Sequence, residues 1–309
     1  MNIGFLSNCL DMNLEKKIIA ASELRFDDIE IFCSESKDSD LRIDKVSREY
    51  LEKIKIQLFH NNINVSSLAL YRNMLSENKS EKKYIEELLY KLVDTADILG
   101  VNIVSTFIGK DVNLSTEENF DLFEDIFKPA VYYADRKNIK IAIENCSMPS
   151  WHPQGYPSTI SYSPEFWDEM FKRIPSKNFG LNFDPSHLIW QQIDYLAALE
   201  KYSERIFNIH LNEIKLDKDN LKRYGIFGKQ LEREHKYDFG WYNSVTIGSG
   251  DIDWRYIIKL LIELNYKGSL TIEFKDKNHK NNLSILTGLK QSKEYINNII
   301  EGEYNNVKI

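Results

Sequence analysis

This chain of 309 residues has few cysteines, no excess of basic charge and no long apolar runs. Because three is an odd number and is small for a chain of this length, we do not expect a disulfide framework. A net charge of -7 argues against a surface for nucleic acid or an anionic membrane, since both require a basic face. No apolar run approaches a membrane span, and the N-terminus lacks the pattern of a secretory signal. We therefore expect a cytoplasmic protein with small-molecule ligands.

The sequence also lacks a glycine-rich phosphate turn after its first predicted strand, a low-complexity linker and an internal repeat. The missing turn disfavours an open doubly wound sheet that binds a dinucleotide. Because no boundary is visible and 42% of the residues are hydrophobic, we expect residues 1–309 to form a single domain with a large core.

Strand-like and helical patterns alternate along the whole chain. Short apolar runs predict strands at residues 2–7, 28–33, 64–70, 101–108, 139–144, 179–184, 206–210 and 270–274. Helical periodicity follows at residues 13–24, 45–61, 81–99, 116–137, 164–173, 193–204, 254–265 and 283–300. This alternation predicts an α/β fold of the (β/α)₈ TIM-barrel class.

Two connections are longer than the barrel requires, at residues 145–164 and 212–253. The first contains four of the seven prolines, which predicts a stiff segment. The second mixes charged and aromatic residues. Both begin at strand ends that carry polar side chains, so we expect lids or walls over the barrel mouth. For the second segment, contact with another subunit in a homo- or hetero-oligomer is an open alternative.

The last four predicted strands end in side chains that can bind a metal: Glu144, Asp184, His210 and Glu273. Each has a structural alternative. Either glutamate could pair with a cationic side chain, and Asp184 could cap the next helix. His210 could be a satisfied core histidine. Because a closed barrel gathers its strand ends at one mouth, the coincidence of four such residues favours a shared site.

Three carboxylates and one imidazole form an oxygen-rich, mostly hard ligand set. This set suits Mn²⁺, Mg²⁺ or Co²⁺ better than a structural Zn²⁺, which prefers thiolates. An α-hydroxyketone could fill the open positions with two oxygens. The cation would then stabilise the charge that develops when a carbon-bound proton is removed. Glu144 and Glu273 are the candidate groups that remove and return this proton.

Segments 141–146, 180–188, 206–213, 248–254 and 266–273 resemble the sugar phosphate isomerase/epimerase family of xylose isomerase-like barrels. The resemblance covers nearly the whole chain. Its motifs are specific for the superfamily and weak for the substrate. It implies a TIM barrel that acts on a sugar.

The resemblance also implies roles for individual residues. Glu144, Asp184, His210 and Glu273 would bind one divalent cation, often manganese in this family, so Mn²⁺ is our first expectation. Zn²⁺ is a further alternative beside Mg²⁺ and Co²⁺. His187, from the Asp-x-x-His motif, would contact substrate, and we add it to the two glutamates as a candidate catalytic residue.

Two segments depart from the family pattern. Residues 210–213 lack the lysine of a common His-x-Lys-Asp motif and carry the longer acid Glu213. Residues 246–254, which end at Trp254, lack an arginine and a proline that many relatives have before the glycines. We expect both segments at the pocket, with Glu213 and Trp254 as substrate contacts.

Further pocket contacts are expected from the first long loop. Trp151 and His152 are candidates because an aromatic face can cover the apolar side of a sugar ring. The alternative is a loop folded on its own side chains.

Cys9, Cys33 and Cys146 follow strands, and no thiol-activating residue is visible beside them in sequence, so small pocket-lining roles are expected. Glu30, in the second strand, is either a partner of a ligand or a rim charge, and both alternatives stay open.

Three functions follow from these patterns. The leading hypothesis is a metal-dependent isomerase or epimerase of a keto sugar or polyol, acting through an enediolate. The second is a lyase that eliminates water or another β-substituent from a 3-keto sugar or glycoside. An abasic-site endonuclease is disfavoured, because that class needs further histidines after the second and third strands and this chain is acidic.

Overall fold

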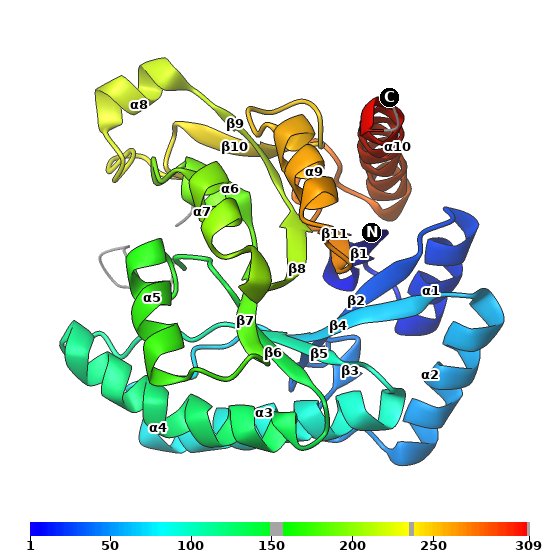
Figure 1. Ribbon diagram of the computed structural model, residues 1–309, viewed down its shortest axis with the longest axis vertical. Helices are drawn as coiled ribbons and strands as arrows, with labels where there is room; N and C mark the ends of the chain where they lie inside the picture. Colours follow the sequence, from blue (N-terminus) through cyan, green and yellow to red (C-terminus); the bar gives the residue numbers. More distant parts are fainter. Residues whose placement is uncertain (149–156, 235–237, 308–309) are drawn as a thin grey trace.

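The computed structural model describes residues 1–148, 157–234 and 238–307, and its centre is a closed barrel of parallel strands (Figure 1). The strands are β1 (Asn2–Leu6), β2 (Asp28–Ser34), β4 (Asn64–Leu70), β5 (Ile103–Thr106), β6 (Lys140–Glu144), β7 (Phe179–Phe183), β8 (Ile206–Leu211) and β11 (Ser269–Ile272). Neighbours in this order pair along the sheet, and β1 pairs with both β2 and β11, which closes the barrel. The predicted TIM barrel is therefore confirmed.

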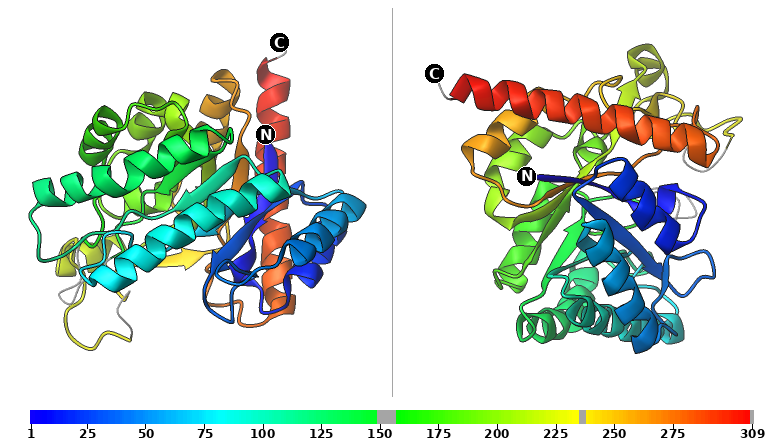
Figure 2. Two further views of the ribbon diagram at one scale, coloured as in Figure 1. Left: turned by 90° about the horizontal axis from the view of Figure 1, so that it is seen from below. Right: turned by 90° about the vertical axis from the view of Figure 1, so that its right-hand side faces the viewer.

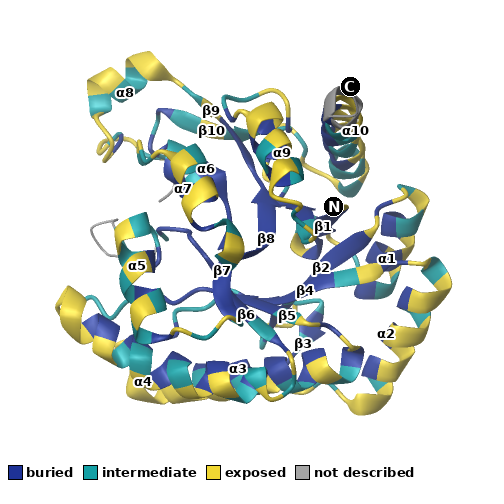
Figure 3. Cartoon of the chain, viewed as in Figure 1, coloured by how far each residue is buried: buried dark blue, intermediate teal, exposed yellow. Residues whose placement is uncertain are grey.

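Helices cover the outside of the barrel (Figures 1 and 2). They are α1 (Leu14–Glu23), α2 (Arg48–Asn61), α3 (Lys79–Leu99), α4 (Thr116–Asp135), α5 (Pro164–Arg173), α7 (Tyr195–Lys201), α9 (Trp254–Glu263) and α10 (Asn282–Val307). Their buried faces meet the strands and their exposed faces point outward (Figure 3). Among the described residues, no helix is both long and apolar enough to cross a membrane.

The ends of these helices follow local sequence signals. Asn78 begins α3 by accepting hydrogen bonds from the backbone N–H groups of Ser80 and Glu81. Gly100 ends it in the left-handed conformation, at φ 74°. The helix therefore begins two residues before the predicted start and ends where the sequence predicts.

Several short elements lie within segments that the sequence assigns to loops. They are β3 (Leu41–Arg42), α6 (Pro185–Ile189), β9 (Glu213–Leu216), α8 (Lys218–Tyr224) and β10 (Tyr242–Val245). Two 3₁₀ turns, at Ser7–Cys9 and Ser203–Arg205, instead overlap the ends of the predicted strand 2–7 and the predicted helix 193–204. Strands β9 and β10 form an antiparallel hairpin outside the barrel, with α8 beyond it (Figure 1). The second long connection thus contains a hairpin and a short helix.

The interior of the barrel carries buried polar side chains where branched aliphatic residues are usual. Asn208 donates to Glu30 Oε2 at 2.9 Å and to Asn182 Oδ1 at 3.2 Å. Thr271 Oγ1 in turn donates to Asn208 Oδ1 at 3.1 Å. Because these groups satisfy one another, the network can be buried at modest cost, and it forms the base on which the strand ends are held.

Candidate metal centre and active site

The four side chains predicted as metal ligands converge at the barrel mouth. Glu144 is the last residue of β6, Asp184 follows β7, His210 lies in β8 and Glu273 follows β11. One donor atom from each residue lies within 4.8 Å of the other three, and all four residues are buried. The closed barrel produces this convergence, because its parallel strands end on the same face.

The imidazole of His210 is oriented by Glu30. Glu30 Oε1 lies 3.2 Å from His210 Nε2 and accepts a hydrogen bond of 2.6 Å from the Tyr71 hydroxyl. The other nitrogen, Nδ1, faces Glu144 Oε2 at 3.7 Å and Glu273 Oε2 at 3.9 Å, and makes no hydrogen bond within the described residues. A carboxylate on one nitrogen and an open second nitrogen is the arrangement of a metal-binding histidine. Glu30 is thus a buried partner of His210 and not a rim charge.

Asp184 serves two structural needs with separate oxygens. Its Oδ1 accepts from Ser186 N at 2.8 Å and caps α6, whereas Oδ2 accepts from Asn212 Nδ2 at 3.3 Å and faces the cluster. Asn212 also donates to Glu273 Oε2 at 3.0 Å. Asn145 holds the backbone of Asp184 through two hydrogen bonds, of 2.7 and 2.9 Å. The capping and ligand interpretations of Asp184 are therefore compatible.

Electrostatics favour a cation at this point. Burial, together with the charges of Glu273 and Glu144, raises the pKa of Asp184 above its ordinary value. Burial also disfavours a charged Glu144, but the two histidines beside it outweigh burial and lower its pKa. Lys275 adds a direct ion pair with Glu273 Oε1 at 2.5 Å. Three crowded carboxylates and an open imidazole nitrogen fit a divalent cation in charge and in ligand type.

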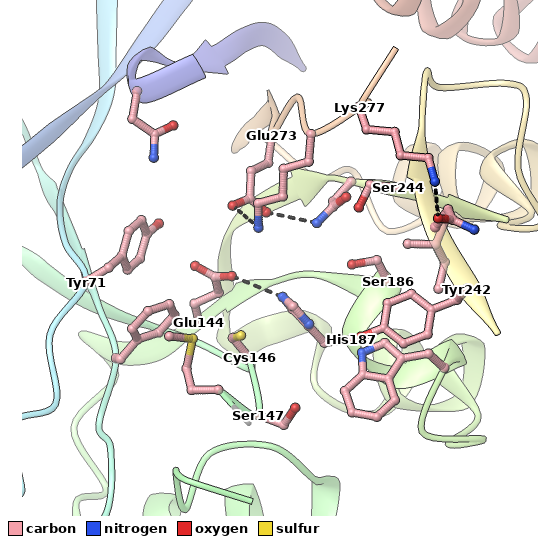
Figure 4. Close-up of a pocket in the computed structure, with 18 of the residues that line it drawn as sticks. Tyr71, Glu144, Cys146, Ser147, Ser186, His187, Tyr242, Ser244, Glu273 and Lys277 are labelled. Atoms are coloured by element: carbon pink, nitrogen blue, oxygen red, sulfur yellow. Dashed lines mark hydrogen bonds and ion pairs between the residues drawn. The ribbon is translucent and has the colours of Figure 1, made fainter. Parts of the chain in front are cut away.

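A cavity of about 600 Å³ opens above the cluster (Figure 4). Glu144, His187 and Glu273 line it on the barrel side. The second long connection contributes Ile214, Glu234, Asp238, Tyr242, Asn243 and Ser244, and the first contributes Cys146, Ser147 and Met148. Residues of both connections therefore form part of the cavity wall. Trp151 and His152 lie outside the described residues.

His187 lies in the short helix α6 and points toward the cluster (Figure 4). Its Nε2 is 3.5 Å from Glu144 Oε1 and 3.4 Å from Asp184 Oδ2. The thiol of Cys146 lies in the same group, with donor atoms of Cys146, His187 and Glu144 within 4.8 Å of one another. Cys146 lines the cavity, as expected, and the barrel brings to it a histidine that is distant in sequence.

The structure does not bring Glu213 and Trp254 into the cavity. Glu213 accepts hydrogen bonds from Trp254 Nε1 at 2.8 Å, from Gly248 N at 3.1 Å and from Ile252 N at 3.2 Å. Both side chains are buried, and neither is among the residues that line the cavity. The longer acid is therefore used to hold the loop before α9, which differs from the predicted substrate contact.

The family model for the xylose isomerase-like TIM barrel matches residues 18–298, so the chain belongs to that family. An inosose dehydratase of Clostridium perfringens is 30% identical over 116 residues, which are 37% of this chain and 37% of that protein. SgbU of Haemophilus influenzae, provisionally named an L-ribulose-5-phosphate 3-epimerase, is 23% identical over 298 residues, 93% of this chain and 94% of that one.

Among solved structures, the IOLI protein with a bound zinc atom matches with a TM-score of 0.72. The match covers 98% of this chain and 99% of that chain at 17% identity. At this identity the match shows the shared fold alone. The chain spans little more than a third of the length of the first of these relatives, so the family model, and not these relatives, establishes the family.

Proposed function

We propose that this protein is a metal-dependent enzyme that isomerises or epimerises a keto sugar or polyol through an enediolate. The observation that carries the proposal is the buried cluster of Glu144, Asp184, His210 and Glu273 at the floor of a large cavity. The named relatives, an inosose dehydratase and a ribulose phosphate epimerase, support a small-molecule sugar or polyol as the substrate.

The four-residue cluster would hold one divalent cation, with Mn²⁺ as the first expectation and Mg²⁺, Co²⁺ or Zn²⁺ as alternatives. When bound, the cation supplies Lewis-acid stabilisation of the negative charge on the substrate carbonyl oxygen. Three carboxylates leave a dication with an excess of one negative charge. Lys275, paired with Glu273, offsets this excess at the edge of the cavity.

Glu144 and Glu273 are the proposed proton-transfer groups. They reach the cluster from β6 and β11, which are separated in the barrel by β7 and β8, so they approach a substrate from different directions. Each carboxylate has a second oxygen that faces the cavity side chains His187 or Lys275. One glutamate removes the proton beside the ketone and the other returns it. Asp184 and His210 hold the cation without moving protons.

A lyase is the second candidate, and the position of His187 favours it. Its Nε2 lines the cavity beside Glu144 Oε1, at 3.5 Å. A proton donor next to the abstracting carboxylate is what elimination requires, because the departing hydroxyl or aglycone must be protonated. In the isomerase reaction the same nitrogen would hydrogen-bond a substrate hydroxyl.

A screen in deuterated water distinguishes these candidates. The protein, loaded with Mn²⁺ or Zn²⁺, is incubated with a panel of 2-keto sugars, 3-keto sugars and keto polyols, and products are followed by NMR. Deuterium beside the ketone in an intact skeleton indicates an isomerase or epimerase. Loss of water or of an aglycone indicates a lyase. Absence of both exchange and turnover across the panel, with metal bound, would count against the proposal.

A further inference from the structure

We propose that a second metal site, softer than the first, lies beside it and is formed by Cys146 Sγ, His187 Nε2 and Glu144 Oε1. It would accept Zn²⁺ or Co²⁺. This inference goes beyond the proposed function, which requires a single cation in the four-residue cluster. Glu144 belongs to both sites, so in the doubly loaded protein its Oε1 would bind the second cation and Glu273 would remain as the proton-transfer group.

The geometry of Glu144 is that of a bridging ligand. Its Oε2 lies 3.7 Å from His210 Nδ1 in the first site, and its Oε1 lies 3.5 Å from His187 Nε2 in the second. The sulfur of Cys146 lies beside the contact between Glu144 and His187 (Figure 4). Carboxylate-bridged pairs of catalytic cations are typically about 3.5–4 Å apart, a separation that one carboxylate spans.

Two buried nitrogens flank this bridge. Neither His187 Nε2 nor His210 Nδ1 makes a hydrogen bond to any described residue. The carboxylate oxygens that face these nitrogens are 3.4 to 3.9 Å away, longer than a good hydrogen bond. A cation between each nitrogen and its carboxylates would replace these long contacts with metal–ligand bonds. A cation on each side of Glu144 satisfies both nitrogens at once. Cys146 and His187 also line the cavity, which gives an ion a path to them.

The charges of the ligands balance two dications. The four anionic ligands would be Glu144, Asp184, Glu273 and the thiolate of Cys146, with a total charge of about -4 against +4 for two divalent ions. With one cation the three carboxylates leave one excess negative charge, which Lys275 offsets, so the second cation would be balanced by the Cys146 thiolate and by solvent or substrate anions. On binding, the Cys146 thiol releases its proton to solvent as the sulfur–metal bond forms, while His187 binds as the neutral imidazole.

The ligand types separate the two sites by metal preference. One thiolate and one imidazole make the second site suited to Zn²⁺ and Co²⁺, and poorly suited to Mn²⁺ and Mg²⁺. Three protein ligands leave a position open for a substrate oxygen, as in catalytic zinc sites. In the fully loaded protein this cation would hold the hydroxyl that His187 otherwise hydrogen-bonds, so the substrate would lie between two cations.

Metal titration of the full-length protein tests the proposal. Metal-free protein is titrated with Zn²⁺, Co²⁺ or Mn²⁺, and bound metal per chain is measured by mass spectrometry after desalting. We expect two equivalents of Zn²⁺ or Co²⁺ but one of Mn²⁺. Co²⁺ should also produce a thiolate-to-cobalt charge-transfer band. One equivalent of Zn²⁺ at saturation, with no thiolate band for Co²⁺, would overturn the second site and leave the first intact.

Two matched serine variants locate the thiolate. Cys146→Ser should bind one equivalent of each metal and lose the charge-transfer band. Cys9→Ser, whose cysteine lies outside both groups of donor residues, should keep two equivalents and the band. A band that survives in Cys146→Ser contradicts the assignment. The band in the unaltered protein tests the proposal even if a variant does not fold. Because turnover is not measured, the result is independent of the proposed reaction.

Discussion

His210 is held at one imidazole nitrogen and left open at the other. Nε2 lies 3.2 Å from Glu30 Oε1 and 2.9 Å from Asn182 Nδ2. When the neutral imidazole donates its proton to the Glu30 carboxylate, the Nδ1 lone pair faces Glu144 and Glu273. Tyr71 and Asn208 fix Glu30 in turn through its two oxygens. The polar interior of the barrel thus determines the orientation of a ligand at its mouth.

Glu30→Gln should weaken metal binding while preserving the barrel. The amide no longer selects the correct imidazole tautomer, and such partner substitutions typically cost about 10–100-fold in metal affinity. Isothermal titration with Mn²⁺ measures the change, and circular dichroism checks the fold. Ser105→Ala is the control, because Ser105 is a buried barrel residue hydrogen-bonded to Ser67 and not to His210. An affinity equal to that of the unaltered protein would show that Glu30 does not orient the ligand.

Asp28, at the start of β2, makes stability depend on pH. Burial raises its pKa to about 6, from 3.8 in the unfolded chain, and its Oδ1 makes no hydrogen bond within the described residues. The folded protein therefore binds this proton more tightly than the unfolded chain does. The charged form costs stability above about pH 6, and the cost declines as the pH falls toward 4.

Asp28→Asn should accordingly stabilise the protein at alkaline pH. The variant is neutral throughout, so we expect its free energy of unfolding at pH 8 to exceed that of the unaltered protein by about 1–3 kcal/mol. The advantage should shrink at pH 5, where the carboxyl is largely protonated. Urea unfolding at both pH values measures it. A difference that does not change with pH would mean that Asp28 does not titrate in this range.

Polar residues at the ends of predicted strands indicate the four converging side chains but not the residues that support them. Glu144, Asp184, His210 and Glu273 were recognisable because each polar side chain ends an apolar run. Glu30 and the asparagines inside the barrel interrupt such runs, and only their mutual hydrogen bonds explain why they can be buried. The pairing of Cys146 with His187, and the burial of Glu213 by loop amides, depend on contacts between distant segments that no local pattern records.

At the scale of elements, the β9–β10 hairpin forms one wall of the cavity. Tyr242 of β10 stacks on Trp190 with ring centroids 5.3 Å apart, and Phe239 packs on the same tryptophan at 5.2 Å. These contacts anchor the hairpin beside α6, which carries His187. The described part of this connection is therefore an ordered wall, with Glu234 and Asp238 facing the cavity.

Shortening the hairpin should affect catalysis and not the fold. We would replace residues 219–238 with a short glycine-containing turn, which keeps Phe239 on Trp190. Metal binding and thermal stability should be largely unchanged, whereas kcat/KM on the true substrate should fall because part of the cavity wall is lost. Steady-state kinetics and analytical ultracentrifugation are the measurements. The second one also tests the prediction that this segment contacts another subunit. Unchanged kinetics and an unchanged number of subunits per particle would exclude both roles.

Sequence patterns located the barrel strands and most helices well. Strand β4 and helix α5 have the predicted bounds: β4 ends in the buried apolar run Leu68–Leu70, and α5 begins at Pro164, a residue that favours the first turn of a helix. Helix α6 is only 5 residues long, too short for a period to be visible. Strands β9 and β10 are only four residues each, and their pairing across more than 20 intervening residues leaves no local signal.

In the molecule as a whole, closure of the barrel brings the four ligand side chains together before any metal binds. The core strands and helices pack through apolar contacts away from the mouth, so folding does not require a bound ion. A chelator should therefore abolish turnover reversibly while leaving the circular dichroism spectrum unchanged. His210→Ala should also fold, since the barrel core lies below it, and should bind Mn²⁺ far more weakly. Full activity after complete removal of metal would contradict metal dependence.

In the proposed reaction, Glu144 and Glu273 transfer protons at a substrate held by the four-residue cluster. The most direct measurement is solvent deuterium exchange into the substrate, followed by NMR, for the unaltered protein, Glu144→Gln and Glu273→Gln at matched metal content. Each glutamine keeps the shape of the side chain but loses the base, so we expect turnover to fall by about 10²–10⁴-fold in each variant. We expect one variant to exchange the proton without completing the conversion, because removal and return use different groups. If both variants retain metal and lose less than about tenfold in turnover, the proton-transfer role of these glutamates is wrong.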